Sequence, residues 1–191
     1  MISDVNLAIR EELDKLDSST TIHLSYKRLT IFPGLILTSQ SVSKIKRLDL
    51  SHNNISILPP AIDLLMDLRE LWLHFNPIKK IPKEIEGCTR LEVMDLRGTK
   101  IKEIPPAVST LKRLHELDWS DTPFAEIAKE RFNIETHNLT GLRSTLSNIL
   151  VRQNLEQQLE QFLLENHFAR ETDNKDNIPI ILSFAKVRSL I

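Results

Sequence analysis

The sequence predicts an α/β solenoid in which short parallel strands stack on one side and short helical or 3₁₀ turns line the other. Three observations lead to this prediction. Similar segments begin at Ile45, Leu68, Leu91 and Leu114, a period of 23 residues, and a fixed period of roughly 20 to 50 residues is typical of stacked supersecondary units. The first half of each segment alternates apolar and polar residues, as a strand does. Proline then recurs in the second half, where it ends the strand and suits the first turn of a helix.

We expect about five repeats within residues 20–127, with the strands on the concave face and the helical turns on the convex face. The first repeat, around Ile22 and Leu24, is irregular, because it matches the next one at an offset of 26 residues. The recurring apolar columns predict the core. Cys88 falls in one of these columns and is expected to be a small buried residue rather than a reactive thiol. Trp119 falls in another, so its expected role is core packing.

A polar column separates the two halves of each repeat and reads Asn53, Asn76, Thr99 and Thr122. A buried Asn amide can satisfy backbone groups at the turn after the strand, both in its own repeat and in a neighbouring one. A Thr hydroxyl offers a single donor and does this less completely. The ladder is therefore expected to weaken toward the C-terminal end.

Helices are expected at both ends of the repeats. Residues 1–19 contain an amphipathic helix that would shield the first repeat, because a terminal repeat cannot bury its apolar face alone. The pattern stops after Ile127, and residues 128–191 are predicted to form a helical C-terminal cap or tail. Within it we expect a loop or short cap over 128–138 and then one long helix, or two helices, between 139 and 168. A last short helix either closes the stack or leads into a longer protein.

Composition favours an intracellular, cytoplasmic protein that binds rather than catalyses. The net charge of −1 and the lack of basic clusters interleaved with aromatic residues argue against nucleic-acid and membrane partners. The single cysteine excludes an internal disulfide, and no apolar run is long enough to span a membrane. Phosphate-loop, nucleophile and metal-ligand motifs are missing, so we expect no enzyme, no cofactor and no metal. His23, His52 and His74 lie in adjacent repeats but in different columns, which disfavours a zinc site.

Several columns of the repeats recur in register: leucine or another apolar residue at positions 1, 4 and 6, Asn at position 9, an aliphatic residue at 11 and aliphatic-Pro at 14 and 15. This pattern resembles the leucine-rich repeat family. The segments ILPPAI, KIPKEI and EIPPAV are similar to the plain intracellular class of Ras-suppressor-like proteins. The resemblance covers roughly residues 20–127 and implies a curved solenoid that binds another protein on its concave face. Thr99, Thr122 and Trp119 depart from the family pattern.

Positions 3, 5, 7 and 8 of each repeat are expected on the concave face, and two groups stand out there. Trp72 and Phe75 share one repeat and are flanked by His74 and Arg97; aromatic and Arg side chains are enriched at interface hot spots. Trp72 could instead stack on Arg97 and have no further role. Acidic side chains gather toward the C-terminal end, where they either steer a basic partner or form ordinary solvated surface. The candidate partner-binding residues are Asp49, Trp72, His74, Phe75, Asp95, Arg97, Asp118 and Asp121.

The favoured function is a non-catalytic adaptor, a module that binds a partner protein through the concave face. The alternative is a structural or oligomerising scaffold component, for example a cytoskeletal or ciliary one, that acts through the C-terminal helices. An apolar stripe in that region either packs on the last repeat as a cap or pairs with another helix, including that of a second copy of the chain. Its members are Leu155, Leu159, Phe162 and Leu163.

Overall fold

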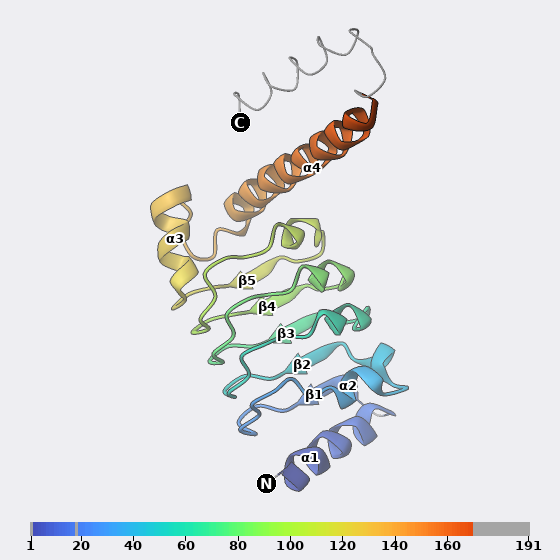
Figure 1. The fold of residues 1–191 in the computed structure, drawn as a ribbon. Helices are drawn as coiled ribbons and strands as arrows, with labels where there is room; N and C mark the ends of the chain where they lie inside the picture. The colour runs from blue at the N-terminus through green and yellow to red at the C-terminus, as the bar shows by residue number, and fades with distance from the viewer. Residues whose placement is uncertain (1, 18, 170–191) are drawn as a thin grey trace. The chain divides into compact units, whose positions relative to one another are not determined.

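The computed structural model describes residues 2–17 and 19–169 (Figure 1). The chain divides into two compact units, Met1–Ser147 and Asn148–Ile191. The first unit holds all the strands of the described residues, and the long helix α4 (Leu139–Ala169) begins in it and continues into the second. The last short helix that the sequence predicts, after Pro179, lies outside the described residues.

Five short strands form one parallel sheet, and their order in the sheet is their order in the chain (Figure 1). From β2 onward, partners in neighbouring strands are 23 residues apart, as Leu48 and Leu71 are. The first pairing differs, because Ile22 lies opposite Leu48 at an offset of 26. The register confirms five repeats with an irregular first one. The strands are β1 (Thr21–His23), β2 (Arg47–Asp49), β3 (Glu70–Trp72), β4 (Val93–Asp95) and β5 (Glu116–Asp118).

Short 3₁₀ helices return the chain to the start of each next strand, on the side of the stack away from the sheet (Figure 1). In the three regular repeats they directly follow Pro59, Pro82 and Pro105, whose φ angles of −72°, −66° and −63° are those the ring imposes. Proline therefore ends the extended segment and starts the turn, as predicted. The elements are η3 (Pro60–Leu64), η4 (Lys83–Gly87) and η5 (Pro106–Thr110), while the longer first connection holds α2 (Leu35–Thr38) and η2 (Val42–Lys44).

The apolar columns lie between the sheet and the 3₁₀ helices and form one continuous core. Cys88 and Trp119 belong to it, and both are fully buried, as predicted. The Cys88 thiol donates a hydrogen bond to the carbonyl oxygen of Ile62 at 3.3 Å, and burial raises its pKa to about 12. Because the thiolate is the reactive form, this cysteine is chemically inert at neutral pH.

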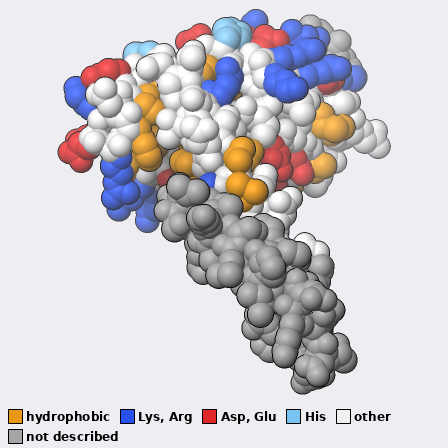
Figure 2. All heavy atoms as spheres, turned by 90° about the horizontal axis from the view of Figure 1, so that it is seen from above, with side chains coloured by type: hydrophobic (Ala, Val, Ile, Leu, Met, Phe, Trp, Pro, Cys, Tyr) orange, Lys and Arg blue, Asp and Glu red, His pale blue; other side chains and the backbone are white. Residues whose placement is uncertain are grey.

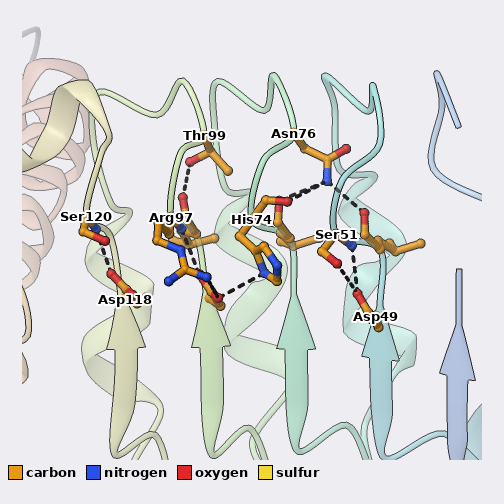
Figure 3. A network of polar contacts seen from close by, with 12 residues as sticks. Asp49, Ser51, His74, Asn76, Arg97, Thr99, Asp118 and Ser120 are labelled. Carbon is orange, nitrogen blue, oxygen red and sulfur yellow. Dashed lines mark hydrogen bonds and ion pairs between the residues drawn. The ribbon is translucent and has the colours of Figure 1, made fainter. Parts of the chain in front are cut away.

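The Asn ladder links neighbouring repeats (Figure 3). The Nδ2 group of Asn76 donates to the carbonyl of Leu73 in its own repeat, at 3.0 Å, and to that of Leu50 in the preceding repeat, at 2.8 Å. Its Oδ1 atom accepts from the amide N–H of Ile55 at 2.9 Å. The Asn53 amide bridges the first and second repeats in the same way, donating to Leu24 O at 2.7 Å. Each Asn therefore joins two turns of the solenoid.

The Thr members of the ladder make fewer such contacts. The Thr99 hydroxyl donates to the Leu96 carbonyl at 2.6 Å, and the Thr122 hydroxyl donates to Trp119 O at 2.7 Å. Both acceptors belong to the same repeat as their donor. The predicted weakening of the ladder toward the C-terminal end is therefore visible in its hydrogen bonds.

The ends of the stack are helical. α1 (Ile2–Asp14) and η1 (Lys15–Asp17) precede the first strand, and Ile9 and Leu16 are buried in the common core. At the other end α4 is one uninterrupted helix, which decides between the two alternatives left open by the sequence. Leu142 and Leu146 near its start are buried in the core.

A helix, rather than a loop, follows the last strand. α3 (Pro123–Phe132) begins inside the segment that the sequence assigns to the last repeat and covers part of the predicted 128–138 loop. Its first turn is capped by Thr122, whose hydroxyl oxygen accepts from Ala125 N at 3.2 Å. Asn133 ends it in the left-handed conformation at φ 52°, a common helix C-terminal conformation. Of the loop and the short cap that the sequence left open for 128–138, the first part is therefore helical, and this helix begins earlier than expected because the cap and the proline at the first helical position outweigh the repeat pattern.

Candidate binding face

We define the strand face as the side chains of the five strands that are not in the core, together with the residues two and three positions after each strand. The middle residue of every strand is buried, and the residues on either side of it are half-buried or exposed. This alternation places positions 3 and 5 of each repeat outward. The predicted binding residues all lie on this face.

Three of the predicted acidic residues hold the turns that follow their strands (Figure 3). The Oδ1 atom of Asp49 accepts from the Ser51 amide at 2.9 Å, and also from the Ser51 hydroxyl at 2.7 Å. Asp95 and Asp118 accept from the amides of Arg97 and Ser120, at 2.9 and 2.8 Å. A short acidic side chain that bonds the backbone two residues on is a turn-stabilising device. The spacing of Asp followed two residues later by Ser or Arg is the signal that could have revealed this role.

β3 departs from that column, because Trp72 occupies the position of the aspartates. It lies in register with Asp49 on one side and Asp95 on the other. The Trp72 side chain is half-buried on the strand face. A large aromatic ring therefore stands between two carboxylates, where the repeat pattern would place a third.

An aromatic row runs along the edge of the strand face and consists of Tyr26, His52 and Phe75. The Tyr26 and His52 rings are stacked, with centroids 4.2 Å apart and planes 10° apart, and the His52 and Phe75 centroids are 4.7 Å apart. All three residues have left-handed backbone conformations, with φ between 53° and 57°. Tyr26 is 70% exposed and Phe75 is 45% exposed. Tyr26 and His52 are not among the predicted binding residues, although position 8 of three successive repeats carries a ring.

Gly98 ends the aromatic row and makes room for it. A Cβ atom at this position would lie 2.6 Å from Cδ1 of Phe75, closer than two carbon atoms can approach without displacement. Gly98 also has a φ of 65°, which glycine adopts without steric cost. The Phe75 ring therefore lies over the backbone of the next repeat.

Arg97 and His74 flank the Phe75 ring and share one carboxylate. The Arg97 guanidinium carbon is 5.6 Å from the Phe75 ring centroid, within cation–π range. Asp95 Oδ2 lies 3.7 Å from Arg97 Nη2 and 3.0 Å from His74 Nδ1, the latter pair not in hydrogen-bonding alignment. Burial lowers the pKa of His74 from its usual value, and Asp95 opposes this only in part. His74 is thus neutral at pH 7, and the positive charge of this cluster resides on Arg97.

Charge is distributed unevenly along the strand face. Near its N-terminal end Arg47 and Glu70 form an ion pair at 2.8 Å. At its C-terminal end Glu116, Asp118 and Asp121 have no ion pair within the described residues. On the face drawn in Figure 2, Lys and Arg side chains gather toward both sides, with hydrophobic side chains exposed between them. In the described part of the chain, no three His, Cys, Asp or Glu side chains are placed to hold a metal ion.

The fold and the Asn ladder define a leucine-rich repeat solenoid. The family model described as leucine-rich repeats (2 copies) matches residues 43–86, and these repeats belong to the leucine-rich repeat family. Leucine-rich repeat proteins are in general non-enzymatic modules that bind proteins on extended surfaces. The assignment to the Ras-suppressor-like class stays a prediction.

Several solved structures are similar to this chain, among them the following two. A leucine-rich repeat protein of Leptospira interrogans has 24% sequence identity and a TM-score of 0.49, with 60% of this chain and 34% of that one covered. An internalin of Listeria monocytogenes has 21% identity and a TM-score of 0.42, with 52% of this chain and 30% of that one covered. The chain thus spans about a third of the length of each. No curated protein matches the sequence significantly.

Among the described residues, no helix is long and apolar enough to cross a membrane.

Proposed function

We propose that this protein is a non-catalytic adaptor that binds a partner protein through the strand face, with Trp72, the aromatic row and Arg97 at the centre of the interface. The observation that supports this most is the exposure of Tyr26 and Phe75 on a strained backbone. A left-handed conformation costs a non-glycine residue about 1–2 kcal/mol. The backbone takes this conformation at position 8 of every repeat, and glycine adopts it without this cost, as Gly98 does. Two large exposed rings therefore occupy positions where glycine would be less costly for folding, which favours a role for the rings in binding.

The chemistry of the strand face fits a protein better than a small molecule. Trp, Tyr and Arg are the residues most often found at interface hot spots, and here they extend over several repeats instead of lining one cavity. The aromatic row is already stacked before binding, and Gly98 holds Phe75 over the neighbouring repeat. Preorganised rings lose little conformational entropy when a partner covers them.

Replacing Trp72 by Ala should weaken binding of the partner at least about 30-fold, because truncating an aromatic hot spot costs about 2 kcal/mol or more. The immobilised wild-type protein and the variant would be used side by side to capture partners, and each candidate would then be titrated by calorimetry. Phe132→Ala is the matched control, since Phe132 is an exposed ring on α3, outside the strand face. This assignment would be contradicted by a partner whose affinity is unchanged by Trp72→Ala but whose binding is lost when residues 148–191 are removed.

Removing charge from the acidic end should slow association with a basic partner and leave dissociation nearly unchanged, because exposed charges act mainly through long-range steering. Asp118→Asn and Asp121→Asn are suitable changes, since an asparagine in place of Asp118 would keep an oxygen that can accept from Ser120 N. Stopped-flow rates would be compared at low salt and at about 1 M, where the Debye length falls to about 3 Å. An effect of equal size at both salt concentrations would rule out steering.

A second function, oligomerisation through α4, rests on one observation. Val151 and Leu155 lie one helical turn apart and are 58% and 42% exposed. The side chains of Leu159, Phe162 and Leu163, which complete the predicted stripe, lie outside the described part of the structure. Sedimentation equilibrium at rising concentration tests this function: a mass that rises for wild type but not for Leu155→Asp supports it, and a constant monomer mass rejects it.

A further inference from the structure

A groove runs along the edge of the solenoid formed by the loops that follow the ladder residues. It consists of three hollows between successive repeats. The first, lined by Ile31 and Ile57 among others, shares Ser56 and Ile57 with the second. The second shares Lys79 and Lys80 with the third. Because neighbouring hollows have lining residues in common, they lie side by side along this edge, and we call the row of three hollows the edge groove.

One end of the edge groove is apolar. Ile31 and Ile57 occupy equivalent positions in adjacent repeats, 26 residues apart, and are 76% and 73% exposed. No other large hydrophobic residue in the described structure is as exposed. Single exposed apolar residues are ordinary, but two at the same position of adjacent repeats, on the walls of one groove, form a ridge that a partner can cover.

The other end of the edge groove is basic. Lys79, Lys80, Lys100 and Lys102 line its third hollow, and Glu103 is the single acidic residue among the lining residues. Lys80 lies 3.8 Å from Glu103, and both side chains are exposed, so this pair contributes little. The other three lysines have no ion pair within the described residues. The third hollow therefore concentrates positive charge, and Pro123 is the apolar residue among its lining residues.

We propose that the edge groove binds a linear segment of a partner protein that carries apolar residues at one end and several carboxylates at the other. Its apolar residues would cover Ile31 and Ile57, and its carboxylates would lie among the lysines. The charge of the groove selects an acidic ligand, and its elongated shape across three inter-repeat hollows fits a single chain. This site lies on the edge formed by the loops and is separate from the strand face. On the strand face, Glu116, Asp118 and Asp121 have no ion pair within the described residues, so the charge there is negative.

A fluorescent synthetic peptide tests the proposal by anisotropy. The probe carries alternating isoleucine and serine followed by four glutamates, and a second probe has the reverse order. At least one order should bind saturably, and the double variant Lys79→Glu/Lys100→Glu should weaken it at least about tenfold, because two attractive surface contacts become repulsive. Ile57→Ser should weaken binding without changing its salt dependence. A probe with glutamine in place of glutamate should bind at least about tenfold more weakly.

Controls separate this site from general electrostatics and from the strand face. Lys112→Glu/Arg113→Glu reverses two exposed charges outside the groove and should change the affinity less than about twofold. Trp72→Ala should leave peptide binding intact, so that the two proposed sites fail independently. The proposal is overturned if neither probe binds saturably, or if the control double variant matches the groove variant. It is also overturned if vesicles of anionic lipid, and not the peptides, show the dependence on Lys79 and Lys100.

Discussion

Replacing Trp119 by Ala should lower the free energy of unfolding by about 3–5 kcal/mol, the usual cost of truncating a fully buried Trp. Trp119 is 0% exposed and stands where the earlier repeats have Leu50, Leu73 and Leu96. Its ring centroid is 6.3 Å from that of Phe124, which follows it in the start of α3. Truncation would leave a cavity between the last strand and the helix that covers it. Urea denaturation followed by circular dichroism measures the change.

A second substitution separates packing from hydrogen bonding at Trp119. The indole N–H is buried without a hydrogen-bond partner in the described structure, and an unpaired buried donor is itself unfavourable. Trp119→Phe removes this donor and keeps most of the ring volume, so its cost should be well below that of Trp119→Ala. Equal losses for the two variants would show that the indole ring does not fill the core as the structure indicates.

Replacing Asn76 by Ala should cost up to about 3 kcal/mol, because several buried backbone groups lose their partner at once. The amide N–H of Ile55 and the carbonyl of Leu50 both belong to the preceding repeat. Asn53→Ala should lie nearer to about 1 kcal/mol, since the half-buried Asn53 side chain is closer to water, which can replace part of its hydrogen bonding. Midpoints of urea denaturation compare the two variants with wild type.

Placing an asparagine at a ladder position that now holds threonine is the control for the two alanine variants. Thr99→Asn should be neutral or stabilising, because an amide at this position could reach the preceding repeat, which the Thr99 hydroxyl does not. Unchanged midpoints for both alanine variants would show that the ladder is not buried as described. A destabilising Thr99→Asn would instead show that the spacing between the third and fourth repeats is matched to the shorter side chain.

Most of the repeat architecture could be predicted because each column repeats one physical requirement. An apolar residue at positions 1, 4 and 6 faces the core in every turn, and the three extra residues of the first repeat shift only the pairing of β1 with β2. The boundary at α3 was missed for a different reason. Phe124 continues an apolar column of the repeat, so the pattern extends past Thr122 although the helix has already begun.

The candidate site was less predictable than the fold. Trp72, Phe75 and Arg97 could be placed on one face from strand periodicity. Tyr26 and His52 could be placed there by the same rule, but the stacking of their rings could not be predicted, because the left-handed conformation at position 8 is uncommon for residues other than glycine. Gly98 is the only glycine at this position. The stacking of the rings depends on this conformation, which the fold imposes on every repeat regardless of the residue present.

Thr122 has a double role that bears on how many turns this protein can have. Its hydroxyl donates to Trp119 O, as a ladder residue does, and the same oxygen accepts from Ala125 N at the start of α3. Each repeat contacts only its neighbours, so the contacts between repeats do not limit how many repeats can stack. The length of the stack is set where one ladder position, followed by Pro123, changes from linking turns to initiating a helix. In this protein Thr122 and Pro123 together end the row of repeats, because they start a helix where the next turn would begin.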